Sequence, residues 1–433
     1  QTETSKFYDR IERILPKDLS TIIYTSGTTG NPKGVMLSHR NILSNCEGAS
    51  HVLPLGPKDL TLSFLPLSHA FERTVGFYGM LFMGSRIAYA ENLTTISQNI
   101  QETHPTILFC VPRILEKIHT SIWDEIRRKP RVIHHLFSHA LDLSSKKKSL
   151  TFFQQLVFKS LSKLFFTKIH QKMGGSLGYI ISGGAKLNPK IATFFEQVGI
   201  PVLQGYGLTE TSPIVTVNPP SDNRIGSVGT PIEGVNVKIS NDGEILVKGD
   251  LIMLGYYKDQ DATKEVIDEN HYFHTGDIGT IDENGYLYIT DRKKEIIVTS
   301  GGKKVAPQTI ENALIENPLI DQACIVGEGE KYLGALLVPN FQRLKNHIRN
   351  MDLTHASNEE LVKSDLVNQL YQGIVDELNQ KLASYETIKK FQLLSQEFSI
   401  ENDELTPTLK LRRKTILTRH GKIVESFYAN PGS

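Results

Sequence analysis

The chain is poor in several features that mark particular classes of protein. Its three cysteines, Cys46, Cys110 and Cys324, lie far apart and match neither a zinc-ligand spacing nor a disulfide framework, which fits a reducing compartment. No run of 18 or more apolar residues occurs, so the sequence predicts no transmembrane helix. Lysine and arginine total 48 against 47 aspartates and glutamates, so no global positive charge predicts nucleic acid as a partner.

What is present is the composition of an ordinary globular protein. The 433 residues are 39% hydrophobic and 22% charged. At roughly 150 residues per domain, this length predicts two to three domains. The first residue is Gln1 rather than Met, so the lack of a signal peptide excludes little. We expect a cytoplasmic location.

Strand and helix patterns alternate through the first half of the chain. Short apolar runs such as "LSTIIYTSG", "PTILFCV" and "LGYIISGGA" lead into polar loops and then into helical patterns. This order predicts an α/β fold with a parallel sheet, in which ligands bind beyond the carboxyl ends of the strands.

From about Gly226 the apolar period changes to two, with turns at "NDG" and "DENG". We therefore predict a large domain over residues 1–291, with a β-rich subdomain over 226–291. A basic run follows Asp291, and we place a smaller α+β domain over 292–433.

The stretch "YTSGTTGNPKG", from Tyr24 to Gly34, combines glycines, hydroxyl side chains and a lysine after a short strand. Glycines let backbone N–H groups converge on an anion, and Lys33 adds a point charge, so the loop is typical of a phosphate site. The spacing does not fit a Walker loop. A surface turn is the alternative interpretation of such a loop taken alone.

The full string resembles, almost letter for letter, the phosphate loop of the adenylate-forming superfamily. That superfamily includes acyl-CoA synthetases, luciferases and the adenylation domains of peptide synthetases. The resemblance implies that this loop holds the β- and γ-phosphates of ATP. The residues concerned are Thr25, Ser26, Gly27, Thr28, Thr29, Gly30 and Lys33.

Two further segments resemble nucleotide motifs of that superfamily. In "QGYGLTETSP", Tyr206 is expected to pack on adenine, Thr209 to bond the α-phosphate and Glu210 to ligate Mg²⁺. A Thr-Glu pair by itself is more often a helix N-cap. In "SGGAKL", the glycine-rich strand end is expected to lie against adenine and the acyl chain. The resemblance adds to the ATP site Gln204, Gly205 and Gly184.

The segments "HTGDIG" and "DRKKEIIVTSGGKKVAP" resemble the ribose and hinge motifs. Asp277 is expected to accept hydrogen bonds from both ribose hydroxyls, although a lone aspartate here is commonly a turn residue. Arg292 is expected to contact the ribose. Lys294 aligns best with the hinge, with Asp291 as the alternative. The expected lining of the CoA channel is Gly301, Gly302 and Lys303.

Near the C-terminus, "LTPTLKLRRK" resembles the motif that carries the catalytic lysine, which aligns with Lys410. Most members have glycine before this lysine, whereas Leu409 stands here. Lys414 is the alternative assignment. Taken alone, a lysine in a basic run is usually a solvated surface residue.

The segments "LPLSHAFERTVGFY" and "CVPRILEKIH" are similar to the long-chain fatty acyl-CoA synthetases within the superfamily. The resemblance places His69 where the acyl tunnel meets the nucleotide. A structural histidine is the alternative.

The resemblance implies a two-step reaction with ATP, Mg²⁺ and CoA. A long-chain fatty acid and ATP give acyl-AMP and pyrophosphate, and CoA then takes the acyl group and releases AMP. A rotation of the smaller, mobile domain about the hinge is expected to separate the steps. The alternatives are transfer to acyl-carrier protein and a non-catalytic fragment that binds ATP or acyl groups. The preferred chain length and the oligomeric state stay open.

The segment 144–172 has seven lysines and no acidic residue. Apolar residues recur at helical spacing, at Phe152, Leu156, Val157, Leu161, Leu164 and Phe165. The commoner explanation is a helix packed on its own domain with a solvated lysine face. The alternative is a peripheral contact with the inner face of a membrane.

About twenty residues precede the phosphate loop, whereas the resemblance implies a long N-terminal subdomain there. We therefore expect that much of this subdomain is lacking. Whether it was removed, is disordered or is naturally absent stays open.

Overall fold

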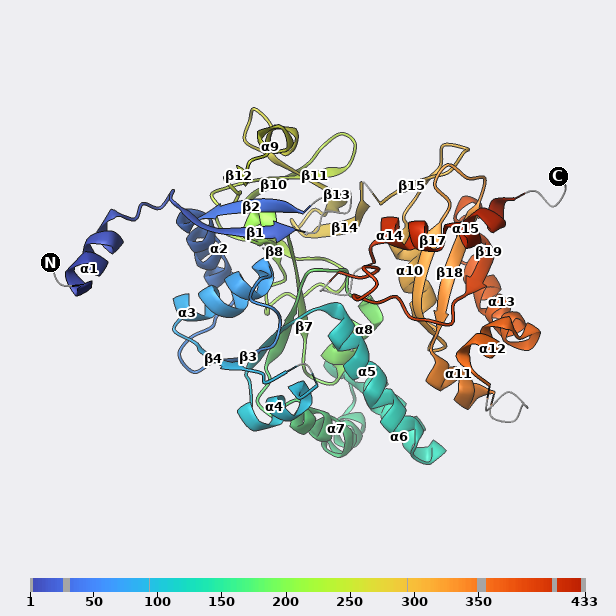
Figure 1. Cartoon of the computed structure of the whole chain (residues 1–433). Coiled ribbons are helices and arrows are strands. Elements are labelled where there is room, and N and C mark those ends of the chain that lie inside the picture. The colour runs from blue at the N-terminus through green and yellow to red at the C-terminus, as the bar shows by residue number, and fades with distance from the viewer. Residues whose placement is uncertain are drawn as a thin grey trace. The chain divides into compact units, whose positions relative to one another are not determined.

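The computed structural model describes residues 3–25, 32–92, 94–293, 295–348, 356–406 and 411–429 (Figure 1). These residues form two compact units. Unit 1 contains the described residues up to 275 together with 279–289, and unit 2 contains 276–278 and the described residues from 290 onward. The predicted boundary at Asp291 stays a prediction.

The centre of unit 1 is a seven-stranded sheet in the order β4-β3-β5-β6-β7-β8-β9. The first five strands in this order pair in parallel, and β8 and β9 add antiparallel partners at one edge. The predicted parallel α/β fold is thus confirmed. The strands are β3 Leu60–Ser63, β4 Arg86–Tyr89, β5 Ile107–Cys110, β6 Tyr179–Ser182, β7 Val202–Gly207, β8 Ile214–Val217 and β9 Thr230–Pro231.

Both faces of this sheet are covered by helices, because its central strands are apolar on both sides. In β5, Leu108 and Cys110 face a cluster built with α4–α8, whereas Ile107 and Phe109 face a second cluster built with α2 and α3 (Figure 1). The helices are α2 His39–Val52, α3 Met80–Phe82, α4 Ile96–Thr103, α5 Pro112–Arg127, α6 Arg131–Ser145, α7 Phe152–Lys172 and α8 Pro189–Gln197. A helix also forms at the start of the chain, α1 Glu3–Arg13.

Two smaller sheets are formed by strands outside the central sheet. Strands β1 Leu19–Thr25 and β2 Lys33–Ser38 form an antiparallel pair, to which β12 Gly255–Tyr256 adds. Ser38 caps α2, because its side chain accepts a hydrogen bond from the Asn41 backbone N–H.

The second small sheet has the order β10-β11-β13-β14 and confirms the predicted β-rich region. One short helix, α9 Gln260–Val266, lies in the same stretch of chain. The strands are β10 Asn236–Ile239, β11 Glu244–Lys248, β13 Phe273–Ile281 and β14 Leu287–Arg292.

Unit 2 has the predicted α+β character. Its sheet has the order β17-β18-β19, and a hairpin of β15 Ile297–Val298 and β16 Lys304–Val305 precedes it. The strands of the sheet are β17 Ile320–Val326, β18 Leu333–Pro339 and β19 Ile388–Leu393. The helices are α10 Pro307–Ile315, α11 Phe341–His347, α12 Asn358–Lys363, α13 Asp365–Asn379, α14 Arg413–Arg419 and α15 Gly421–Tyr428. Within the described part of the chain, no helix is both long and apolar enough to span a membrane.

Candidate active site

Several predicted site residues follow the carboxyl ends of neighbouring parallel strands. His69 lies beyond β3, Gly184 beyond β6, and Thr209 and Glu210 beyond β7. Because the carboxyl ends of parallel strands meet at one edge of a sheet, the fold brings these segments to the same edge. This arrangement is the one that the strand-then-loop pattern predicts.

The β1–β2 hairpin presents the two ends of the phosphate loop. Thr25 pairs with Lys33 in the strand register, and the Thr25 hydroxyl lies 3.4 Å from the Lys33 carbonyl oxygen that accepts its hydrogen bond. Both ends of the predicted loop are therefore held together. The residues between them, Ser26, Gly27, Thr28, Thr29 and Gly30, lie outside the described residues.

Tyr256 connects the phosphate loop to the predicted magnesium ligand. Its hydroxyl donates a hydrogen bond of 2.9 Å to Oε1 of Glu210, and Lys33 Nζ lies 4.8 Å from the centre of its ring. The side chain is only 7% exposed. Burial, followed by the charge of Glu210, raises the pKa of the Tyr256 phenol well above its usual value. Tyr256 thus stays protonated and donates to the carboxylate.

Tyr256 was not predicted from the sequence as a site residue. It stands in "LGYYKD" beside a second tyrosine, Tyr257, and nothing local distinguishes the two. The pairing of β12 with β2, which sets Tyr256 opposite Val35, decides which ring reaches Lys33 and Glu210.

The turn that carries Thr209 and Glu210 is held by a buried asparagine of α2. Asn45 Nδ2 donates to the carbonyl oxygens of Thr211, at 3.3 Å, and Ile214, at 2.7 Å. Its Oδ1 accepts from the Ile214 backbone N–H at 3.2 Å. Asn45 is fully buried, so these bonds do not compete with water. This residue was also missed, because a lone asparagine within a helical pattern carries no local signal.

The residues before this turn lie in strand β7. Tyr206 is buried and packs in an apolar cluster with Val215 and Val228, and its contact with adenine stays a prediction. A Cβ at Gly205 would lie 3.3 Å from the Thr216 carbonyl oxygen, so the close approach of β8 favours glycine there. The backbone carbonyl of Gln204 accepts from the Asn218 N–H at 3.0 Å.

The segment around His69 forms a turn followed by a π-helix, Glu72–Gly79. His69 is partly exposed, and its backbone N–H donates to the Pro66 carbonyl at 2.9 Å. Glu72 is buried and accepts a 2.5 Å hydrogen bond from the Ser63 hydroxyl. Burial raises the pKa of the Glu72 carboxyl to about 7, although the bond from Ser63 lowers it in part.

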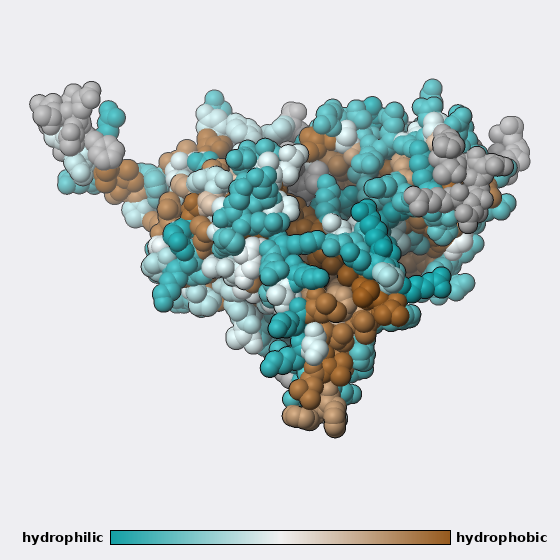
Figure 2. Space-filling model, turned by 90° about the horizontal axis from the view of Figure 1, so that it is seen from below, coloured by the Kyte–Doolittle hydropathy of each residue, from teal (hydrophilic) through white to brown (hydrophobic). Residues whose placement is uncertain are grey.

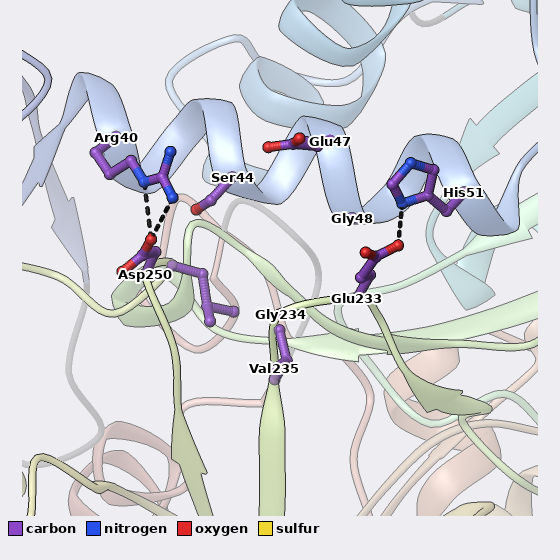
Figure 3. Close-up of a pocket in the computed structure, with 10 residues that line it drawn as sticks. Arg40, Ser44, Glu47, Gly48, His51, Glu233, Gly234, Val235 and Asp250 are labelled. Carbon is purple, nitrogen blue, oxygen red and sulfur yellow. Dashed lines mark hydrogen bonds and ion pairs between the residues drawn. The ribbon is translucent and has the colours of Figure 1, made fainter.

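A separate pocket of unit 1 lies between α2 and the loops around β9–β12 (Figure 3). Arg40 pairs with Asp250 at one end of it, with 2.6 Å between Nη2 and Oδ2, and His51 pairs with Glu233 at the other. Its lining includes none of the predicted site residues. The pocket is therefore not the candidate site.

In unit 2, the predicted ribose residues lie together. Arg292 Nε is 3.0 Å from Asp277 Oδ1, and Asp277 is buried. The backbone N–H of Lys293 donates to the Gly276 carbonyl at 2.7 Å, which holds the two segments against each other. Arg292 thus keeps one oxygen of the carboxylate occupied, and their ribose contacts stay a prediction.

The predicted CoA-channel residues form the tip of the β15–β16 hairpin. Gly302 has a φ of +73°, a left-handed conformation that favours glycine, and its N–H donates to the Thr299 carbonyl at 2.8 Å. Space is open around the position that a Gly302 Cβ would occupy, and Gly301 is likewise open. Lys303 Nζ lies 5.8 Å from the ring centre of Tyr385.

Two predicted residues, the hinge Lys294 and the catalytic Lys410, lie outside the described residues. The alternative Lys414 is exposed on α14. In the described ranges, no group of three or more His, Cys, Asp or Glu side chains is placed to hold a metal ion. A metal there would depend on Glu210 together with ligands from a bound molecule.

Comparison with known proteins identifies the family. The family described as AMP-binding enzyme matches residues 2–257, and the family described as AMP-binding enzyme C-terminal domain matches residues 294–431. The long-chain-fatty-acid–CoA ligase FadD15 of Mycobacterium bovis is 33% identical over 432 residues, which cover 97% of this chain and 71% of that protein. The fatty acyl-CoA synthetase A of Dictyostelium discoideum is 34% identical over 440 residues, covering 96% and 65%.

Solved structures agree with this result. The A-PCP didomain of carboxylic acid reductase from Segniliparus rugosus, solved with AMP, superimposes with a TM-score of 0.71 and 26% identity. The match covers 96% of this chain and 54% of that one. With family models matched over most of its length, the chain belongs to the AMP-binding enzyme family, the adenylate-forming proteins that its motifs resemble.

Proposed function

We propose that this chain is an AMP-forming ligase that activates a long-chain fatty acid with ATP and transfers it to CoA. The observation that carries the proposal is the placement of Lys33 and Glu210 on one buried tyrosine, Tyr256. A cation and a carboxylate held in this way suit a triphosphate with its magnesium ion. Relatives named as long-chain-fatty-acid–CoA ligases support the substrate class.

The first step needs charge control rather than a general base. A fatty carboxylate is already ionised at pH 7, because its reference pKa is near 4. Its approach to a triphosphate is opposed by repulsion. Lys33 would sit at the outer phosphates and lower that repulsion. Thr209, at the same turn as Glu210, would donate to the α-phosphate.

The donor set at Glu210 fits a hard divalent cation. Tyr256 bonds one carboxylate oxygen, Oε1, and so orients the group without neutralising it. Mg²⁺ commonly takes only one or two protein carboxylates and completes its shell with phosphate oxygens and water. When bound, it would offset negative charge on the phosphates. The role of Asn45 is to hold the backbone of this turn.

The remaining roles are carried over from the resemblance. Asp277 and Arg292 would bind the ribose, and the buried Asp277 is oriented for this by the ion pair with Arg292. His69, Gly184, Gln204, Gly205 and Tyr206 would surround the adenine and the acyl group. Lys410 would act in adenylation, and Lys294 would be the hinge. Gly301, Gly302 and Lys303 would admit CoA for the second step.

ATP–pyrophosphate exchange across saturated fatty acids of different length tests the first step. We expect exchange that rises with chain length, since each buried methylene contributes about 0.8 kcal/mol, or about fourfold in kcat/KM. A preference for acetate or an aromatic acid would contradict the substrate class. Thioester formation with CoA, compared with acyl-carrier protein, tests the acceptor. If no acid supported ATP–pyrophosphate exchange, the ligase activity would be excluded and the chain would only bind nucleotide.

A further inference from the structure

Helix α7, Phe152–Lys172, is apolar on two opposite faces. The sequence suggests a single apolar stripe, but the structure divides its members between the two faces. A helix with one apolar face is satisfied by packing on its own domain. The second face of α7 therefore needs a separate explanation.

The first face belongs to the core of unit 1. Its buried residues pack with α6 and α8 in the cluster that covers one face of the central sheet. They are Leu161, Phe165, Phe166 and Ile169. Phe137 of α6 makes edge-on ring contacts with Phe165 and Phe166. These contacts fix the orientation of the helix about its axis, and so fix what its other face presents.

The second face is exposed. Phe153 is 79% exposed, Leu156 is 49% exposed and Leu164 is 43% exposed. Because they are spaced by three and eight residues, they lie on one side of the helix. Phe152 is 71% exposed at the helix start. Figure 2, which looks onto the side of unit 1 that holds α4, α6 and α7, shows apolar surface gathered in a projecting ridge. Large apolar side chains gathered on one exposed helix face mark a contact surface.

Lysines border this apolar face. With 100° per residue, Lys159 and Lys163 fall on one side of the line through Phe153, Leu156 and Leu164, and Lys168 falls on the other. All three are exposed, and no ion pair among the described residues involves them. Lys172 is paired with Glu125 of α5. The stretch 144–172 contributes no acidic residue.

The apolar centre and basic borders of the exposed α7 face indicate which kind of surface could cover this face. A second copy of the chain would bring lysines against lysines across a shared helix face, which is unfavourable. A phospholipid surface offers acyl chains for the aromatic and aliphatic side chains and phosphates for the flanking ammonium groups. We infer that α7 docks this protein on anionic phospholipid bilayers, with Phe153, Leu156 and Leu164 entering the acyl region.

Vesicle sedimentation with the full 433-residue chain tests this. We expect binding to vesicles of phosphatidylcholine with about 30% phosphatidylglycerol, which imitates an anionic membrane leaflet. Binding to vesicles of phosphatidylcholine alone should be weaker. Raising the salt from about 0.1 M to 0.5 M should reduce binding to the anionic vesicles, because it screens the lysines.

Two variants separate the apolar and the basic contributions. Phe153→Ser with Leu156→Ser should weaken binding to both kinds of vesicle by about tenfold or more. The second variant combines Lys159→Gln, Lys163→Gln and Lys168→Gln. It should weaken binding to anionic vesicles by about 10²-fold, because each lysine contributes about fivefold. Its binding to neutral vesicles should not change.

Matched controls lie on unit 2. Leu366→Ser replaces a similarly exposed leucine of α13, and Lys363→Gln, Lys389→Gln and Lys390→Gln replace three exposed lysines. These should leave vesicle binding unchanged, and thermal melts should show that every variant is folded.

Three outcomes would overturn the inference. The first is that the chain does not bind anionic vesicles. The second is that the unit 2 controls lose as much binding as the α7 variants. The third is that the chain is a dimer in sedimentation velocity which Phe153→Ser with Leu156→Ser converts to a monomer, since α7 would then be a protein interface.

Discussion

The phenol of Tyr256 donates a 2.9 Å hydrogen bond to Glu210, while Lys33 lies over the face of the same ring. The three residues come from the phosphate hairpin, the strand that pairs with it and the turn after β7. One buried side chain therefore sets the positions of a cation and a carboxylate that we assign to the triphosphate and its metal ion.

Replacing Tyr256 by phenylalanine should impair the use of magnesium-ATP. The ring and its contact with Lys33 remain, but Glu210 loses a hydrogen bond to a charged group, which is worth about 1.5–3 kcal/mol. We expect about a tenfold or larger loss in ATP–pyrophosphate exchange, with a higher requirement for Mg²⁺. Tyr257→Phe, which alters the adjacent and more exposed tyrosine, is the control. Equal losses in the two variants would argue against an orienting role for Tyr256.

Lys33 and Asp277 should differ in the nucleotide that they affect. Lys33→Ala should weaken binding of ATP far more than binding of AMP, because only ATP has the outer phosphates. Asp277→Ala should weaken both, because both contain ribose. Calorimetric titration with the two nucleotides measures this. If Lys33→Ala weakened ATP and AMP alike, the phosphate assignment of the hairpin loop would be wrong.

The two half-reactions should depend on different residues. Lys410→Ala should slow formation of acyl-AMP by about 10²–10³-fold, because a charge that acts in the transition state is lost. The same variant, given acyl-AMP and CoA, should still form acyl-CoA. Gly302→Trp should show the reverse pattern by placing bulk at the predicted CoA channel.

Controls for these two variants are available in the chain. Lys414→Ala tests the alternative lysine, which is exposed on α14. Gly302→Ala carries the strain of the positive φ without the bulk of tryptophan. Assays of each half-reaction on its own provide the measurement. Equal slowing of both steps by Lys410→Ala would rule out its assignment to adenylation.

Removing Asn45 should lower both stability and activity. Asn45→Ala leaves a buried N–H and two buried carbonyl groups without their partner, and each such group costs about 1–3 kcal/mol. We expect a lower melting temperature and a higher KM for ATP, since the turn with Glu210 loses its support. Ser44→Ala, on the same helix and partly exposed, should change neither. A normal KM for ATP in a destabilised Asn45→Ala variant would confine the residue to a structural role.

Glu72 should make stability fall as the pH rises from about 4.5 to 7. Its carboxyl has a pKa of about 7 in the folded protein against an ordinary value of 4.5. The folded state therefore holds a proton that the unfolded state has lost, and stability decreases with pH over that interval, by about 3 kcal/mol in all. Above about pH 7 both states are ionised and this contribution is constant.

Urea unfolding at pH 5 and pH 7.5 tests the effect of Glu72. Glu72→Gln keeps an acceptor for the Ser63 hydroxyl and cannot ionise, so its loss of stability between the two pH values should be smaller than that of the wild type. Glu91→Gln, which changes an exposed carboxylate, should behave like the wild type. Identical pH dependence in the Glu72→Gln variant would show that this carboxyl is not the source.

Local chemistry explains what could be predicted from the sequence. The strand in "LSTIIYT" and the turns at "NDG" and "DENG" depend on residues within a few positions of one another, and the structure has each of them. The alternation of strands and helices likewise predicts the parallel sheet, and with it the sheet edge at which the segments with His69, Gly184 and Glu210 follow their strands.

The sequence by itself therefore determined the elements, the fold class and the motifs that identify the family. Tertiary structure decided which residues support them. Tyr256 meets Glu210 across 46 positions and Asn45 meets Thr211 across 166, so neither contact has a local pattern. In α7, apolar residues repeat on both faces, and only packing against Phe137 decides which of them are buried and which are left exposed. Hydrophobic periodicity shows at which positions of a helix apolar residues recur. Whether those residues are buried depends on what the rest of the chain places opposite them.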